Sequence, residues 1–188
     1  MRGRLKFGAL FLLLRRTILD LLHALARHGG RHDAEIVLGM SARNAAGVVM
    51  GQEVLKLSAD GKVLMTLGKP GVTGDANSTD AFDQPTDIYV APNGDIYVAD
   101  GYGSQFVLRF DKDGKFISKF GGRSTQPTNP GRWMQAHGIA LDTRSGTPLL
   151  VVTERIRNEF NWFTLDGVHV RGVYLPGAYV SRPVIHKD

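Results

Sequence analysis

The sequence predicts an all-β fold of the β-propeller class, partial in extent, with about three four-stranded blades, a stub of a fourth and an N-terminal helix. The main observation is a repeat of Asp-Gly turns at constant spacing. The turn aspartates are Asp60, Asp113 and Asp166, so the period is 113 − 60 = 53 and 166 − 113 = 53 residues. A period near fifty with four strands per unit is typical of a propeller blade. A β-sandwich is the rival fold, but it does not predict a repeat without gaps.

The middle unit, residues 84–121, shows the strand pattern most clearly. Short runs of β-branched and aromatic residues are separated by Asn93-Gly94 and Asp113-Gly114. These dipeptides are strong hairpin signals, because glycine tolerates the positive φ that tight turns require. A sheet of four short strands cannot bury both faces alone, so the unit needs neighbouring sheets. The expected strands are 87–91, 95–100, 106–111 and 115–121.

The neighbouring units repeat this pattern. Residues 54–68 match residues 107–121 without a gap, and residues 160–174 form a third copy. The front of the first unit is weaker, with strand-like runs at 34–40 and 46–51 and no clean turn between them. The segment after the third copy looks like the crossing into a fourth blade. We therefore expect blades over about 31–68, 84–121 and 135–174.

Charge and composition exclude several function classes. The chain has 188 residues and a formal net charge of +5. Residues 1–50 hold eight basic and three acidic residues, 8 − 3 = +5, so residues 51–188 hold 15 basic and 15 acidic residues and carry no net charge. Without an overall basic field, the repeats are not expected to bind nucleic acid. The lack of cysteine excludes disulfides, thiolate metal sites and cysteine nucleophiles.

Residues 1–30 differ from the repeats and are expected to form a helical segment ahead of the propeller region, residues 31–188. An apolar run, residues 7–14, is interrupted by two arginines and followed by leucines at helical spacing. The run is too short to span a bilayer and makes a poor secretory signal. A packing helix and a helix lying on a membrane surface both fit this pattern.

Residues at the start of each blade's first strand converge at one mouth of a propeller, and a site is expected there. Here these residues are Thr86 with Asp87, His137 and, by its spacing, His32. His32 precedes its turn aspartate by 60 − 32 = 28 residues, and His137 precedes its own by 166 − 137 = 29. Neutral imidazoles that meet on an axis suit zinc. The alternative is an ordinary hydrogen-bonding role for each histidine.

Four motifs occur in order within the repeats: QPTD at 84–87, DGYG at 100–103, HGIALD at 137–142 and TERIRN at 153–158. Together with the blade pattern over about residues 54–167, they resemble NHL-repeat six-bladed β-propellers. Within that group they are similar to the peptidyl-α-hydroxyglycine α-amidating lyases, also called peptidylamidoglycolate lyases. The blade pattern fits any NHL protein, whereas the ordered motifs are more specific to the lyases.

The resemblance implies a set of site residues. His137 matches a zinc-binding histidine of the family. His32 stands where another is expected, although its flanking residues match poorly. Tyr102 matches the active-site tyrosine, which would take a proton from the substrate, and Arg155 matches an arginine that would bind the substrate carboxylate. A structural calcium ion is also a trait of the family.

Two of these roles have plainer alternatives. Tyr102 could be an aromatic residue on the surface of a blade. Arg155 could form a salt bridge with Glu154 or Glu159. The family motif has aspartate where this chain has Glu154, which is a mild departure.

The reaction implied by the resemblance is cleavage of a carbinolamide, in a small peptide or amide substrate, to an amide and glyoxylate. The resemblance also implies a secreted or periplasmic protein. Six blades at this period need about 6 × 53 residues, so we expect an incomplete or inactive fragment, or a chain that closes a ring with another copy. Open blade edges would favour self-association.

Two other function classes compete with the lyase. One is a non-catalytic NHL module that binds protein or another ligand through the polar connections 69–82 and 122–134. The other is a lactonase-like calcium propeller, which would need acidic residues clustered at the mouth. Asp87 is the single acidic residue expected at the mouth, which is weak evidence for such a cluster.

Overall fold

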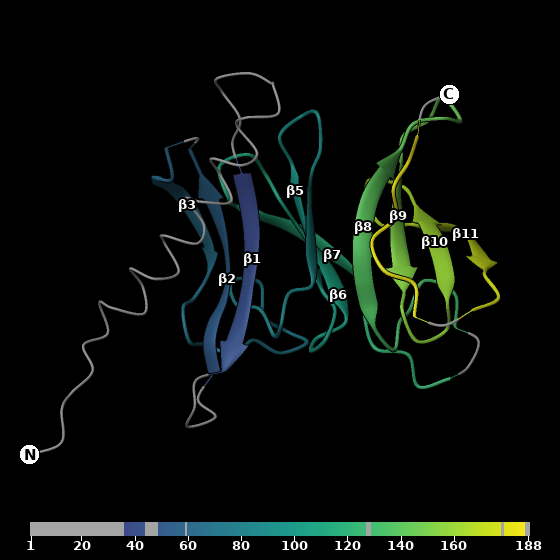
Figure 1. Ribbon diagram of the computed structural model, residues 1–188, viewed down its shortest axis with the longest axis horizontal. Coiled ribbons are helices and arrows are strands. Elements are labelled where there is room, and N and C mark those ends of the chain that lie inside the picture. The colour runs from purple at the N-terminus through teal and green to yellow at the C-terminus, as the bar shows by residue number, and fades with distance from the viewer. Residues whose placement is uncertain (1–35, 44–48, 59, 127–128, 178, 187–188) are drawn as a thin grey trace, which may run out of the picture. The chain divides into compact units, whose positions relative to one another are not determined.

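The computed structural model describes residues 36–43, 49–58, 60–126, 129–177 and 179–186, and within these ranges the protein is all-β (Figure 1). The described strands form three sheets. The predicted helical segment 1–30 and the predicted ligand His32 lie outside the described residues. No helix in the described part of the chain is long and apolar enough to cross a membrane.

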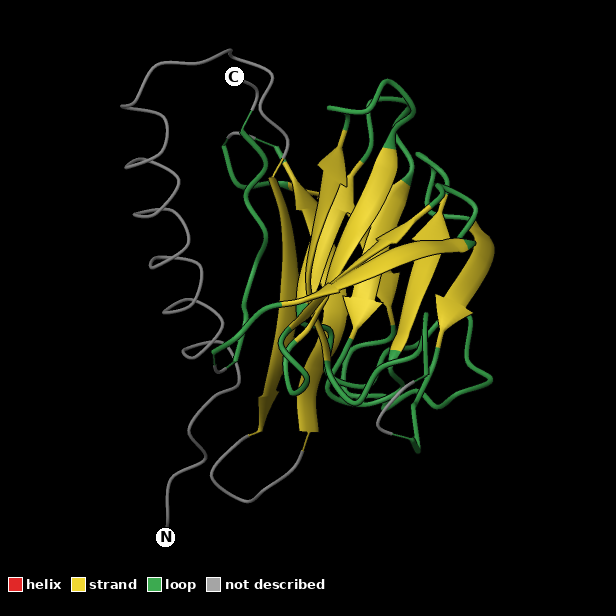
Figure 2. Cartoon of the chain, turned by 90° about the vertical axis from the view of Figure 1, so that its right-hand side faces the viewer, coloured by secondary structure: helices red, strands yellow, loops and turns green. Residues whose placement is uncertain are grey.

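The middle sheet has the strand order β4-β5-β6-β7, and its neighbouring strands are antiparallel; all described strands are drawn in yellow in Figure 2. Its positions confirm the strands predicted for residues 84–121. Gly94 (φ 91°) and Gly114 (φ 84°) sit in its hairpin turns, where a side chain would strain the backbone. The strands are β4 (Asp87–Val90), β5 (Ile96–Asp100), β6 (Phe106–Phe110) and β7 (Phe116–Gly121).

The third sheet repeats this topology, with the order β8-β9-β10-β11. It lies directly beside the middle sheet, and the first strands of the two sheets touch. The Thr86 hydroxyl donates to the Ala136 carbonyl at 3.1 Å, and the Ile139 amide donates to Asp87 Oδ2 at 2.9 Å. The strands are β8 (Ala136–Asp142), β9 (Leu149–Glu154), β10 (Glu159–Phe163) and β11 (His169–Tyr174).

The first sheet differs from the expectation of four strands. Its described part has three, in the order β1-β2-β3: β1 (Ile36–Arg43), β2 (Val49–Leu57) and β3 (Val63–Gly68). β2 runs continuously through the point where two separate strands were expected, because no turn sequence interrupts it. Residues 53–57, in β2, precede β6 by one period of 53 residues, so β2 corresponds to the third strand of a blade. β1 pairs with β2 and therefore corresponds to the second strand of a blade rather than to the first.

An aromatic cluster fills the space between the middle and third sheets. Trp133 is fully buried, and its ring centroid lies 6.2 Å from that of Phe120 and 5.3 Å from that of Phe163. Trp133 sits against Gly121, where a Cβ atom would collide with the indole ring. Gly121 ends β7 and Trp133 lies in the connection before β8, so this contact packs the connection against the end of β7.

Three buried amide side chains recur at the repeat period: Gln52, Gln105 and Asn158, with 105 − 52 = 53 and 158 − 105 = 53. All three have positive φ, at 68°, 64° and 54°. Each side-chain oxygen accepts a backbone N–H from the segment that follows its sheet. Gln52 accepts from Gln84, Gln105 from Ala136 at 3.1 Å and Asn158 from Val180 at 3.2 Å. We refer to these residues as the connecting amides.

The chain divides into two compact units, Met1–Val37 with Leu55–Thr66 and Leu38–Val54 with Leu67–Asp188. The second unit contains both four-stranded sheets and the aromatic cluster between them. Two antiparallel four-stranded sheets that touch through their first strands are neighbouring propeller blades. The predicted all-β propeller class is therefore confirmed for the described residues.

Candidate functional site

His137 is the second residue of β8, at the place where the third sheet begins beside the middle one. Its Nε2 lies 3.2 Å from Nη1 of Arg155. A guanidinium only donates, so Nε2 is the acceptor and the ring proton belongs on Nδ1. Nδ1 is buried and has no hydrogen-bond partner among the described residues. Burial lowers the pKa of His137, the Arg155 charge lowers it further and Asp87 opposes them, so the imidazole is kept neutral.

Tyr102 comes from the loop between β5 and β6 and reaches the same place. The centroid of its ring lies 5.7 Å from that of His137, with an interplanar angle of 60°. The flanking glycines allow this approach: a Cβ atom on Gly101 would collide with the Ala136 carbonyl, and one on Gly103 would collide with Asp83. Tyr102 is 42% exposed, so the ring forms part of a surface open to solvent rather than part of the core.

Asp100 holds the Tyr102 loop in place. Its buried carboxylate accepts the Asp83 amide at 2.8 and 2.9 Å and the Ser104 hydroxyl at 2.6 Å. The carboxylate therefore joins the loop to the segment that enters β4. Burial raises the pKa of Asp100 to about 6, although the bonds from Ser104 and Asp83 act in the opposite direction.

Arg155 follows β9, and its own loop is held by a second buried carboxylate. Glu154 is fully buried and accepts backbone N–H groups from Gln135 at 3.2 Å and from Ile156 at 2.9 Å. Arg155 also donates its backbone N–H to the Gln135 carbonyl at 2.9 Å. The tyrosine and the arginine of the site are thus each presented by a short loop that begins at a buried acidic residue.

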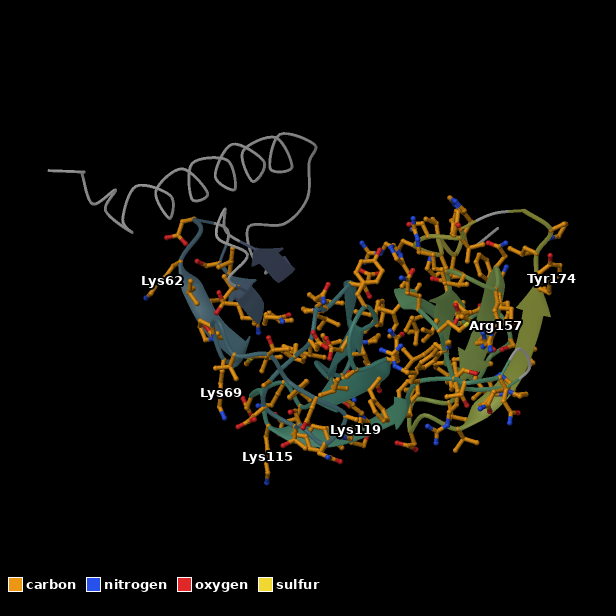
Figure 3. All side chains as sticks on the ribbon, turned by 90° about the horizontal axis from the view of Figure 1, so that it is seen from below. Lys62, Lys69, Lys115, Lys119, Arg157 and Tyr174 are labelled. Atoms are coloured by element: carbon orange, nitrogen blue, oxygen red, sulfur yellow. The ribbon has the colours of Figure 1, made fainter. Side chains whose placement is uncertain are left out.

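The alternative expected for Arg155, a salt bridge with Glu154 or Glu159, is not what the structure shows. Both acidic residues pair instead with Arg157, which lies in the turn between β9 and β10 and is labelled in Figure 3, at 3.9 and 3.4 Å. The Arg155 guanidinium contacts His137 and the face of the Tyr179 ring, whose centroid is 5.5 Å from Cζ.

Two further residues of this neighbourhood were not predicted from the sequence. Arg182 pairs with Asp87, Nε to Oδ2 at 3.2 Å, and Tyr179 lies against Arg155 as described above. Both follow the last strand, in a segment without a repeat signal or a motif. The one indication in the sequence that this segment returns to the site is its place directly after the third blade, where the chain crosses toward a further blade.

The described residues do not by themselves fit a catalytic zinc ion. Such a site needs about three protein ligands, and no group of three or more His, Asp or Glu suited to a metal occurs in the described ranges. His137 offers one imidazole, but its Nε2 faces a guanidinium. The second predicted ligand, His32, falls in the part of the chain that is not described, so zinc and the structural calcium both stay predictions.

Comparison with known proteins agrees with the motifs. A family model described as "NHL repeat" matches residues 82–110. The chain is 35% identical over 80 residues to the probable peptidyl-alpha-hydroxyglycine alpha-amidating lyase pgal-1 of Caenorhabditis elegans, covering 43% of this chain and 22% of that protein. It is 34% identical over 93 residues to the mouse peptidyl-glycine alpha-amidating monooxygenase, covering 47% and 9%. Human NHL repeat-containing protein 3 is 30% identical over 95 residues, covering 50% and 26%.

These matches confirm the predicted resemblance: the chain contains an NHL repeat and is related in sequence to amidating lyases. The aligned region spans about a quarter or less of the length of these curated relatives. Among solved structures, a streptogramin B lyase superposes with a TM-score of 0.46 at 18% identity, covering 79% of this chain and 47% of that one.

Proposed function

We propose that this chain forms part of a lyase site that cleaves the carbinolamide of an N-acyl-α-hydroxyglycine to an amide and glyoxylate. The observation that carries the proposal is the meeting of three side chains from three separate elements. Arg155 lies 3.2 Å from His137, and the Tyr102 ring lies 5.7 Å from the His137 ring, centroid to centroid. A cation, a neutral imidazole and a phenol suit a substrate that has a carboxylate and an ionisable hydroxyl group.

Arg155 would bind the substrate carboxylate. No ion pair joins its guanidinium to an acidic residue in the described ranges, since Glu154 and Glu159 pair with Arg157. A partly buried guanidinium without a carboxylate partner favours an anionic ligand, which it can hold through two parallel N–H donors. The carboxylate of a hydroxyglycine supplies such a ligand.

Tyr102 would act as the base. In the proposed step its phenolate takes the proton of the carbinol hydroxyl, and the carbon–oxygen bond becomes a double bond as the carbon–nitrogen bond breaks. The electron pair of the carbon–nitrogen bond passes to the amide nitrogen, which takes the proton that Tyr102 removed, so the tyrosine returns to its starting state. The products are glyoxylate and the amide, with no oxidant or reductant required. The exposed position of Tyr102 beside His137 leaves room for a substrate at this point.

The direct test is glyoxylate release from N-benzoyl-α-hydroxyglycine by the purified full chain, with and without added zinc. The lyase proposal expects release that falls at least tenfold in Tyr102→Phe and in Arg155→Gln. A protein that releases no glyoxylate under either condition contradicts the proposal. Zinc is tested separately by elemental analysis: metal that is bound stoichiometrically and lost in His137→Ala would support the predicted role of His137.

The second candidate function is a non-catalytic NHL module that binds a protein or another ligand. It is supported by the similarity to human NHL repeat-containing protein 3. A stable protein that binds no zinc and has no lyase activity would favour this class.

A further inference from the structure

Tyr179 is an exposed aromatic residue that contacts the site rather than the core. Its side chain is 61% exposed, and its ring lies against the guanidinium of Arg155, with Cζ 5.5 Å from the ring centroid. An aromatic face holds a guanidinium by cation–π attraction while the N–H groups at the guanidinium edge stay available for a ligand. The contact therefore orients Arg155 without using its donors.

The backbone of Tyr179 is strained, and a buried amide holds it. Tyr179 has φ 59°, in the left-handed region that residues other than glycine rarely adopt. The Asn158 side chain donates to the Gly177 carbonyl on one side and accepts the Val180 amide on the other, at 3.2 Å. In addition, the Leu175 amide donates to the Asn158 carbonyl at 2.8 Å. Strain of this kind is retained where surrounding contacts impose it, and it is common at binding sites.

The residues after Tyr179 are fixed against the start of β8. A Cβ atom on Gly138, next to His137, would meet the Arg182 Cα atom, the Pro183 ring and the Ser181 carbonyl. Arg182 also pairs with Asp87 at 3.2 Å. Tyr179 therefore lies between two anchored points, the Asn158 side chain before it and the Gly138 backbone after it.

We propose that Tyr179 is a positioning residue of the site, which holds the Arg155 guanidinium in the orientation that binds a carboxylate. This inference rests on the proposed carboxylate-binding role of Arg155 and adds a second residue to it. Asn158 and Gly138 fix the segment, Tyr179 fixes the plane of the guanidinium, and the guanidinium edge receives the anion.

The test is binding of N-acetylglycine, a carboxylate without the reactive hydroxyl group, to the full chain, measured by NMR titration. We expect Tyr179→Ala to weaken binding about two- to five-fold, the factor that corresponds to one exposed cation–π contact. Tyr179→Phe retains the aromatic face and is expected to retain most of the affinity. This rescue separates a positioning role from a merely structural one.

Tyr174→Ala is the matched control. Tyr174 projects from the end of β11 (Figure 3) and is similarly exposed, at 65%, so its removal is expected to leave binding at the wild-type level. If Arg155→Gln abolishes binding while Tyr179→Ala binds like the wild type, the role of Tyr179 is refuted and that of Arg155 stands. If the wild type does not bind N-acetylglycine, or Arg155→Gln binds equally well, the carboxylate role of Arg155 falls, and this inference falls with it.

Discussion

Nη1 of Arg155 lies 3.2 Å from Nε2 of His137, so a cation and an imidazole share one position at the start of the third sheet. Within this pair the positive charge lies on the Arg155 guanidinium, and the His137 imidazole is neutral. An anionic ligand at this place would meet Arg155 first. The geometry also excludes a doubly protonated imidazole, because Nε2 would then point an N–H group at another donor.

Replacing Arg155 by glutamine is expected to raise the pKa of His137. The positive charge beside the ring is one of the causes that lower this pKa, and it is removed in Arg155→Gln. The pKa should stay below its ordinary value, because burial is the larger cause and persists. A pH titration of the His137 ring resonances by NMR measures both values. His169, whose pKa is lowered by burial and which contacts Asn161 in the third sheet rather than the site, serves as the internal reference and should titrate as before.

Asp100 is expected to make the free energy of unfolding fall as the pH rises from about 4 to 6. Its pKa is about 6 in the folded protein, above the ordinary value of 3.8 that holds in the unfolded chain, so the folded state binds more protons than the unfolded state within this window. The expected loss is on the order of 2–3 kcal/mol. Urea denaturation at several pH values measures it, and Asp100→Asn should lack this component. Equal pH dependence in both proteins would contradict the assignment.

Gly121→Ala is expected to destabilise the protein by roughly 3 kcal/mol or more, because the new methyl group strains a backbone at φ 87° and collides with the Trp133 ring. Gly146→Ala is the matched control. Gly146 has a similar φ of 84° but no atom within 4 Å of the added Cβ, so only the backbone strain of about 1 kcal/mol remains. Thermal and urea denaturation of both variants measure the difference, and equal losses would show that the Trp133 contact is unimportant.

Gln105→Leu is expected to cost about 1–3 kcal/mol and to speed hydrogen exchange at the Ala136 amide. The substitution leaves this buried N–H without its acceptor, which lies at 3.1 Å. The Ile139 amide, which donates to Asp87 instead, is the control within the same strand and should exchange as in the wild type. Unchanged protection of Ala136 would mean that the amide side chain does not hold the two sheets together.

The repeat was predictable because its turns depend on local sequence. Asp113-Gly114 and Asn93-Gly94 specify hairpins by glycine's tolerance of positive φ, and the confirmed strands flank these turns. The first sheet was predicted less well. No such dipeptide separates the expected strands before Val54, and β2 runs through the gap. The pairing of β2 with its neighbouring strands depends on contacts between residues distant in the sequence, which a short sequence pattern does not specify.

The candidate site was predictable where a motif carried it and not elsewhere. Tyr102, His137 and Arg155 stand in ordered motifs, and the structure brings the three together, although their chemical roles remain predictions. Tyr179 and Arg182 come from a segment with no motif, and their contacts depend on how the chain returns past β8. The spacing of the connecting amides, at 52, 105 and 158, was present in the sequence. The structural role of these residues became apparent only from their positive φ angles and from their hydrogen bonds to the segment that follows each sheet.

The connecting amides have a consequence for biosynthesis. Gln52 and Gln105 each reach a backbone group about thirty positions later in the chain, 84 − 52 = 32 and 136 − 105 = 31, and Asn158 reaches one at 180 − 158 = 22 positions. A polypeptide emerging from the ribosome would therefore secure one blade only when the start of the next has been synthesised, so that maturation would proceed stepwise from the N-terminal side. Translational pausing shortly before Ala136 would leave the middle blade temporarily unsecured and exposed to proteases.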